Sequence, residues 1–226
     1  MSEQAVQQYI PLDVPLPPVS NKTVFSDEQW KVFMALADTV IPSIRSRGQS
    51  NSITDKIVPA SDLERAVSAL TASIPGPDAT QLARQYLEER PSENPKFKIG
   101  VQRLFSEFVP EEGVKGLSLI LNALTSRAGS LILTGSTTPI ADQPLEVREK
   151  VFRGWETSRI PPVRAVYRGL SAIFKKTWVT VSPTICPVLG FPRTPIHGIP
   201  ADGVPFEFIQ IPPGDNPETI DTDIVI

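Results

Sequence analysis

The fold class is decided by residues 26–42, which read SDEQWKVFMALADTVIP. Ser26 can cap a helix, Gln29 three residues later completes a capping box, and Pro42 prevents the helix from continuing. Between these ends, apolar residues recur at steps of three and four and so share one helix face: Trp30, Phe33, Met34, Ala37, Val40 and Ile41. The stretch therefore predicts an amphipathic helix whose apolar face joins a core.

Three more helices are predicted before residue 110. After a polar loop from Arg45 to Lys56, Ser61 or Asp62 can cap the second, and residues 78–90 predict the third. The fourth begins at Asn94, a capping residue that a proline follows. Its apolar stripe is expected to be buried: Phe97, Val101, Leu104, Phe105 and Phe108.

The later part of the chain adds a fifth, a sixth and a seventh helix. Residues 111–126 predict the fifth, and residues 130–133 either extend it or form a separate buried turn. The sixth starts near Pro144, and the seventh follows Pro161-Pro162. Their inward faces are Leu145, Arg148, Val151, Phe152 and Trp155, then Val163, Val166, Tyr167, Leu170, Ile173, Phe174 and Trp178. The fold is thus predicted to be mainly α, an irregular bundle of about seven helices.

Prolines, which exclude long helices, mark the edges of this bundle. Residues 1–22 predict a flexible, polar and proline-rich tail, and residues 23–180 a helical N-terminal domain. Residues 181–218 are expected to be a proline-rich, extended connecting segment, with a short strand at 206–211. A second strand is expected at 219–226, so that one or two strands close the chain.

Composition excludes several classes of partner. Lys and Arg number 22 against 25 Asp and Glu, a net charge of −3 that offers no basic stripe for nucleic acid. The most apolar window, residues 117–133, is interrupted by polar residues and falls short of the roughly 20 apolar residues that span a bilayer. No transmembrane helix is predicted. The lone Cys186 and a polar N-terminus without a signal pattern favour an intracellular protein.

The sequence offers few groups for catalysis. His197, the only histidine, lies in a Pro-Ile-His-Gly loop with no identifiable partner, and Cys186 is expected to be a buried structural thiol. One histidine and one cysteine do not form a zinc site by themselves. We therefore predict no catalytic, cofactor-binding or metal-binding residue in this chain.

Three short polar motifs have ordinary structural explanations. The charged runs at 88–90 and 148–150 are either docking patches or, more commonly, pairs on a solvated helix face. Residues 127–130, Arg-Ala-Gly-Ser, could hold an anion, but they lack a phosphate-loop lysine and a glycine-rich pattern.

The last residues carry the most specific pattern. The run at 220–226, IDTDIVI, is typical of the first strand of a dinucleotide-binding unit, although any edge strand can end in this way. The glycine turn that binds the pyrophosphate does not follow within the chain, so the strand alone is not expected to bind a nucleotide.

Several blocks together resemble the N-terminal region of long-chain fatty alcohol oxidases, flavoproteins of the glucose-methanol-choline oxidoreductase group. The blocks are QWKVFMALADTVIPS at 29–43, LSLILNALTSRAGSLILTG at 117–135 and LEVREKVFRGWETSR at 145–159. The Pro-Ile-His loop at 195–197 and the strand at 219–226 complete the resemblance, which extends from about Phe25 to Ile226.

The resemblance implies an FAD-dependent oxidation of long-chain primary alcohols by oxygen to aldehydes and hydrogen peroxide. It also implies peripheral membrane association or a peroxisomal location. In the family the FAD-binding glycine loop and the C-terminal histidine region come after the strand at 219–226, so no site residue is carried over. The chain is therefore expected to be the helical part and first flavin-domain strand of such an oxidase, inactive alone, with the FAD domain as its partner.

The alternative is a stand-alone helical subunit or regulatory protein. The helices could close a core without a further domain, and ALADTVIP at 35–42 resembles the small subunit of gluconate-type flavin dehydrogenases. Its expected partner is a flavoprotein subunit.

Overall fold

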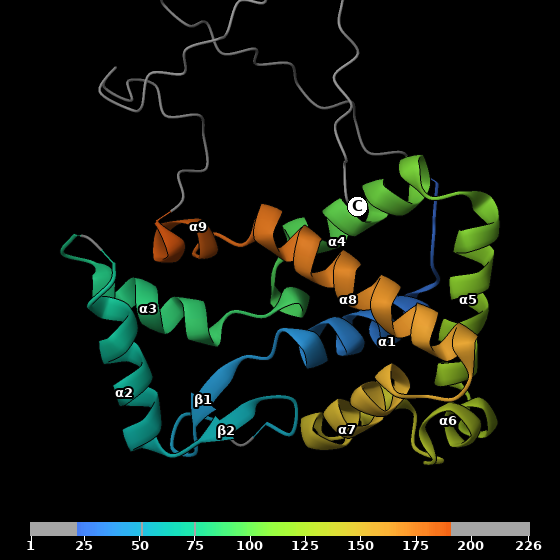
Figure 1. Ribbon diagram of the computed structural model, residues 1–226, viewed down its shortest axis with the longest axis horizontal. Helices are drawn as coiled ribbons and strands as arrows, with labels where there is room; N and C mark the ends of the chain where they lie inside the picture. Colours follow the sequence, from blue (N-terminus) through green and yellow to red (C-terminus); the bar gives the residue numbers. More distant parts are fainter. Residues whose placement is uncertain (1–21, 51, 75, 191–226) are drawn as a thin grey trace, which may run out of the picture. The chain divides into compact units, whose positions relative to one another are not determined.

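The computed structural model describes residues 22–50, 52–74 and 76–190, which belong to one compact unit. The prediction of a mainly α fold is confirmed: nine α-helices and one pair of short strands make up the described residues (Figure 1). The elements are α1 (Asp27–Val40), β1 (Ile44–Ser46), β2 (Lys56–Val58), α2 (Ala60–Thr71), α3 (Ala79–Glu88), η1 (Pro91–Glu93), α4 (Pro95–Arg103), η2 (Leu104–Phe108), α5 (Glu111–Thr125), α6 (Arg127–Thr134), η3 (Ile140–Asp142), α7 (Leu145–Glu156), α8 (Pro161–Val181) and α9 (Ile185–Leu189).

Helix α1 begins with the predicted capping box. The Gln29 amide N–H donates to Ser26 Oγ at 3.3 Å, and the Ser26 amide N–H donates to Gln29 Oε1 at 2.8 Å. The side-chain amide of Gln29 also donates to Ser118 Oγ on α5, at 2.7 Å. The cap therefore both starts α1 and fastens it to α5, because one side chain satisfies the helix end and reaches the neighbouring helix.

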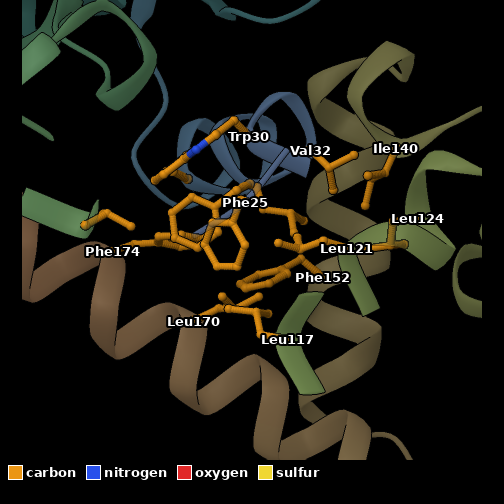
Figure 2. Close-up of a cluster of buried hydrophobic side chains, with 14 of the residues drawn as sticks. Phe25, Trp30, Val32, Leu117, Leu121, Leu124, Ile140, Phe152, Leu170 and Phe174 are labelled. Atoms are coloured by element: carbon orange, nitrogen blue, oxygen red, sulfur yellow. The ribbon is translucent and has the colours of Figure 1, made fainter. Parts of the chain in front are cut away.

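Helix α1 contributes to the centre of the main core, where it meets α4, α5, α7 and α8 (Figure 2). Phe33 is fully buried and packs edge-on against Phe174 of α8, with ring centroids 5.0 Å apart. Phe25 lies 5.2 Å from Phe105, again edge-on. These edge-to-face contacts suit the charge distribution of aromatic rings and add to the burial of their apolar area.

Residues 127–134 form a separate helix, α6, rather than an extension of α5. The two helices are bent by 103° at the break between them. Ser126 caps α6, since its Oγ accepts from the Gly129 amide N–H at 3.0 Å. None of the described helices is by itself long and apolar enough to cross a membrane, although the bent pair α5 and α6 together meet that test by length and composition.

Two predictions in the first third of the chain need correction. The ends of the polar loop predicted from Arg45 to Lys56 belong to two strands, because Arg45 and Ser46 lie in β1 and Lys56 begins β2; the strands pair in parallel with Ile44 opposite Lys56. Strands of three residues are too short to produce a periodic pattern. Helix α2 begins at Ala60, with Pro59 as the cap residue and no side-chain cap from Ser61 or Asp62. The amides of Asp62 and Leu63 donate to the Pro59 carbonyl, so Asp62 already lies in the first turn.

Phe108 was predicted to be buried, but its side chain is 71% exposed. The cause is the π-helical turn η2, in which the Val109 amide donates to the Leu104 carbonyl, five residues back. A π turn holds one more residue than an α turn and so rotates the following side chains around the axis. Phe97, Val101 and Phe105 are buried as predicted, whereas Leu104, the first residue of the turn, is only half-buried.

A second, smaller core joins α2, α3 and α9. Val188 of α9 is buried there with Val67 and Ala83. Helix α9 lies within the predicted connecting segment. It has only five residues, so the prolines of this segment, which exclude long helices, do not prevent it. The predicted strands at 206–211 and 219–226 and the tail at 1–21 lie outside the described residues.

Candidate functional site

An open groove is lined by residues of α6, α7 and the start of α8. Its volume is about 560 Å³, within the roughly 300–1,000 Å³ of typical ligand sites. One face of α7 forms a wall, and the C-terminal end of α6 and the first turn of α8 form the others. The groove is lined by Ile132, Leu133, Thr134, Gly135, Ser136, Val147, Lys150, Val151, Gly154, Trp155, Ser158, Ile160 and Val163.

A smaller pocket adjoins the groove and has only apolar surface. Its volume is about 210 Å³, and it shares Leu133, Trp155 and Val163 with the groove. The shared side chains make the two hollows neighbouring parts of one site. The apolar pocket is completed by residues of α5 and α8: Ile120, Pro162 and Val166.

Trp155 fixes the wall between the groove and the apolar pocket. Its indole Nε1–H donates to the Leu133 carbonyl at 3.0 Å, which holds the end of α6 against α7. The indole ring is buried and lies 5.6 Å from the ring of Phe152, which in turn lies 4.8 Å from Tyr167 of α8. The floor of the site is therefore part of the packed core and is rigid.

The rim of the groove exposes large apolar side chains. Ile132 is 82% exposed and Ile160 is 59% exposed, and Val147 is also exposed. Scattered apolar residues are ordinary at a protein surface, but these line one hollow. Their clustering makes the groove a candidate binding surface.

The charges around the groove are positive. Lys150 lines it, and Arg164 lies beside it, with Nη1 donating to the Ser158 carbonyl at 2.5 Å. Among the described residues no Asp or Glu lines the groove, and neither cation forms an ion pair. The site can therefore bind apolar and anionic groups, but it holds no pair of titratable groups for acid–base chemistry.

The charged run at 148–150, for which pairing on a solvated helix face was predicted, mainly makes contacts between elements. Arg148 is only 1% exposed, and its Nη1 donates to the Ala35 carbonyl of α1 at 2.7 Å. Burial lowers the pKa of the Arg148 guanidinium, while the charge of Asp38 opposes that shift. Glu149 pairs with Lys56 of β2 at 2.9 Å. Only Lys150 of the three faces solvent at the groove.

The run at 88–90 contains one pair of the predicted spacing, between Arg90 and Glu93, but it also joins elements. Glu89 accepts from Ser182 Oγ at 2.9 Å and from Thr184 Oγ1 at 3.0 Å, in the link between α8 and α9. Arg90 pairs with the buried Asp55 at 2.8 Å.

Burial also raises the pKa of Asp38, whereas the hydrogen bonds from Ser92 and the charges of Arg90 and Arg148 act to lower it.

The other residues singled out in the sequence do not meet at one place. Cys186 is half-buried on α9 rather than fully buried, and His197 lies outside the described residues. Residues 127–130 form the first turn of α6, where Ser130 Oγ donates to the Thr138 carbonyl at 2.8 Å. No cluster of three or more metal-ligating side chains occurs in the part of the chain that the structure describes.

The groove was missed because its residues come from three helices. One signal for it exists: Leu131, Ile132 and Leu133 are consecutive, and three successive positions spread around a helix rather than sharing a face. At least one of them must therefore point away from the core. Comparison with known proteins adds no assignment, since no family model, curated protein or solved structure matches the chain.

Proposed function

We propose that this chain contains the helical, substrate-binding part of an FAD-dependent long-chain alcohol oxidase, and that a flavin-binding domain performs the oxidation. In this role the groove and the apolar pocket hold the alkyl chain of the alcohol. The described helices contribute binding and packing and take no part in the transfer of electrons to FAD.

The observation that carries this proposal is the position of the oxidase-like blocks. The blocks at 29–43, 117–135 and 145–159 lie far apart in sequence, yet their helices α1, α5, α6 and α7 pack around one core. Two of the blocks also line the groove, the second through residues 132–135 and the third through one face of α7. Two of the three blocks on which the resemblance rests thus supply walls of the candidate site.

The chemistry of the lining supports an alkyl ligand. The apolar pocket has no polar surface, so an alcohol hydroxyl placed there would lose its hydrogen bonds to water without replacement. The hydrocarbon end suits the pocket, and each buried CH₂ group contributes about 0.8 kcal/mol. The hydroxyl end then lies in the open groove, where an adjoining domain would have access to it for the oxidation.

A second candidate function is a free helical subunit that binds a flavoprotein. One observation favours it: the described helices close a complete core around Phe33, Phe97 and Phe174, each with no exposed surface. Such a module folds without a further domain. In this case the exposed groove would be a protein contact rather than an alkyl site.

The test measures the binding of dodecanol to the purified chain through the NMR resonance of the Trp155 indole N–H. The resonance is assigned with Trp155→Phe. We expect dodecanol to shift it and hexanol to have a much weaker effect, because the shorter chain buries about six fewer CH₂ groups. The chain alone should be colourless and should form no peroxide from dodecanol.

Two glycines supply a matched pair of variants. A Cβ added at Gly154, on the groove, or at Gly169, on α8 outside it, meets no atom within 4 Å. Gly154→Leu should block dodecanol, whereas Gly169→Leu should bind it like the wild type. Failure of dodecanol to bind the wild-type chain would reject the substrate-binding role and favour the free subunit. A flavin that remains bound through gel filtration would reject the non-catalytic role.

A further inference from the structure

We propose that the groove binds a long-chain carboxylate, with the hydrocarbon in the apolar pocket and the carboxylate between Lys150 and Arg164. This ligand is different from the neutral alcohol of the proposed function, and the inference rests on that function only in using the same apolar pocket.

The segment that forms two walls of the groove is strongly basic. Residues 150–176 contain seven Lys or Arg and a single acidic residue, Glu156, a net charge of +6 in a chain whose total is −3. Within the described residues, none of the seven cations forms an ion pair with a carboxylate. Elsewhere in the unit, Lys31, Lys56 and Arg84 each pair with an acidic side chain. Of the seven, Lys150 lines the groove and Arg164 is held beside it by the Ser158 carbonyl, so these two charges are left for an external anion.

The polarity of the site changes along its length. The apolar pocket meets the groove at Leu133, Trp155 and Val163, whereas Lys150 and Ser158, whose carbonyl anchors Arg164, line only the larger groove. A molecule with one alkyl chain and one anionic end matches this order. At about 210 Å³ the apolar pocket is below the usual range for drug-sized ligands, which suits the end of a single chain.

A bilayer surface is the other occupant that exposed Ile132 and Ile160 could fit. The single chain is favoured because the groove shares Trp155 with a hollow of about 210 Å³ that has only apolar surface, whereas side chains that insert into a membrane stand out from the surface. The two occupants are separated experimentally by using the ligand as a monomer.

The experiment compares dodecanoate, dodecanol and dodecyltrimethylammonium, each below its micelle concentration, at a pH where the carboxylate is ionised. The Trp155 indole resonance reports occupancy. We expect dodecanoate to bind about fivefold more tightly than dodecanol, because exposed charge pairs contribute about 1 kcal/mol, which corresponds to that change in affinity. The cationic amphiphile should bind most weakly. The preference for the carboxylate should decrease between about 0.05 and 0.5 M salt, because ions screen exposed charges.

Lys150→Gln should remove most of the carboxylate preference, so that dodecanoate and dodecanol bind with similar affinities. Lys96→Gln, an exposed lysine on α4 away from the groove, is the matched control and should retain the preference. Equal affinities for dodecanoate and dodecanol would overturn this inference and leave the proposed function intact. If neither ligand binds, both fail. Binding to anionic phospholipid vesicles without binding of monomeric dodecanoate would also overturn the inference, in favour of a membrane surface.

Discussion

Replacing Gly129 by Ala should destabilise the protein, although alanine is the better helix former. A Cβ at position 129 would lie 2.2 Å from the Ala123 carbonyl oxygen, at the bend between α5 and α6. That carbonyl is held in place, because it accepts hydrogen bonds from the Ser126 amide at 3.2 Å and from Ser126 Oγ at 3.0 Å. The added methyl group therefore forces α6 away from α5.

The size of the effect follows from two opposing contributions. Overpacking of this kind costs about 1–3 kcal/mol and at times more, while replacing a helical glycine recovers about 1 kcal/mol. Because the clash is with backbone at far less than contact distance, we expect a net loss of about 2 kcal/mol, or about 4–8 °C in Tm for a chain of this size. The measurement is urea unfolding followed by circular dichroism.

Gly154→Ala is the control for this prediction. It lies inside α7 with nothing within 4 Å of the added Cβ, so the variant should be about 0.5–1 kcal/mol more stable than the wild type. Gly129→Ala should also weaken dodecanol binding, since α6 forms one wall of the groove. A Gly129→Ala protein as stable as Gly154→Ala would refute the close approach of α6 to α5.

Two further predictions concern the core and pH. Phe174→Ala should lower the free energy of unfolding by about 3–5 kcal/mol, whereas Phe108→Ala should change it by less than about 0.5 kcal/mol. Similar losses for the two variants in urea unfolding would contradict the exposure of Phe108 by the π turn η2. Because the folded-state pKa of Asp38 is raised, its contribution to stability is fully present below its unfolded pKa of about 3.9 and is lost as pH rises through the folded value. Asp38→Asn should therefore gain stability relative to the wild type as pH rises from about 3.5 to 6, and the opposite slope would show that the Arg90 and Arg148 charges dominate.

The helices could be predicted because their information is local. The caps at Ser26 and Asn94 and the stripes of α1, α7 and α8 lie within single segments, so periodicity identified them. The failures involve interactions between segments. Arg148 belongs to a charged run in sequence, but its guanidinium is buried because the Ala35 carbonyl of another helix accepts its hydrogen bond. Phe108 moved out of the core through a backbone change that side-chain spacing does not encode.

The candidate site was less predictable than the fold. Its walls come from α6, α7 and α8, and its floor depends on how α6 turns back after α5. A continuous helix from 111 to 134 would carry Leu133 along the axis of α5, away from the Trp155 indole to which its carbonyl is bonded. The groove is thus a consequence of the bend at Ser126, a feature that the consecutive apolar residues 131–133 suggest but do not locate.

The floor of the groove is buried and its rim is exposed, so variants at the rim can test ligand binding without unfolding the protein. Trp155 and Phe152 are buried in the main core, so changing them would alter stability and binding together. Gly154 lies one position before Trp155 on α7, and Lys150 lies five positions before it; both are exposed. Substitutions there change the volume or the charge of the groove while the core contacts stay in place. A loss of ligand binding in a Gly154→Leu protein that is at least as stable as the wild type in urea would therefore locate the ligand in the groove itself, because no loss of the packed floor could account for it.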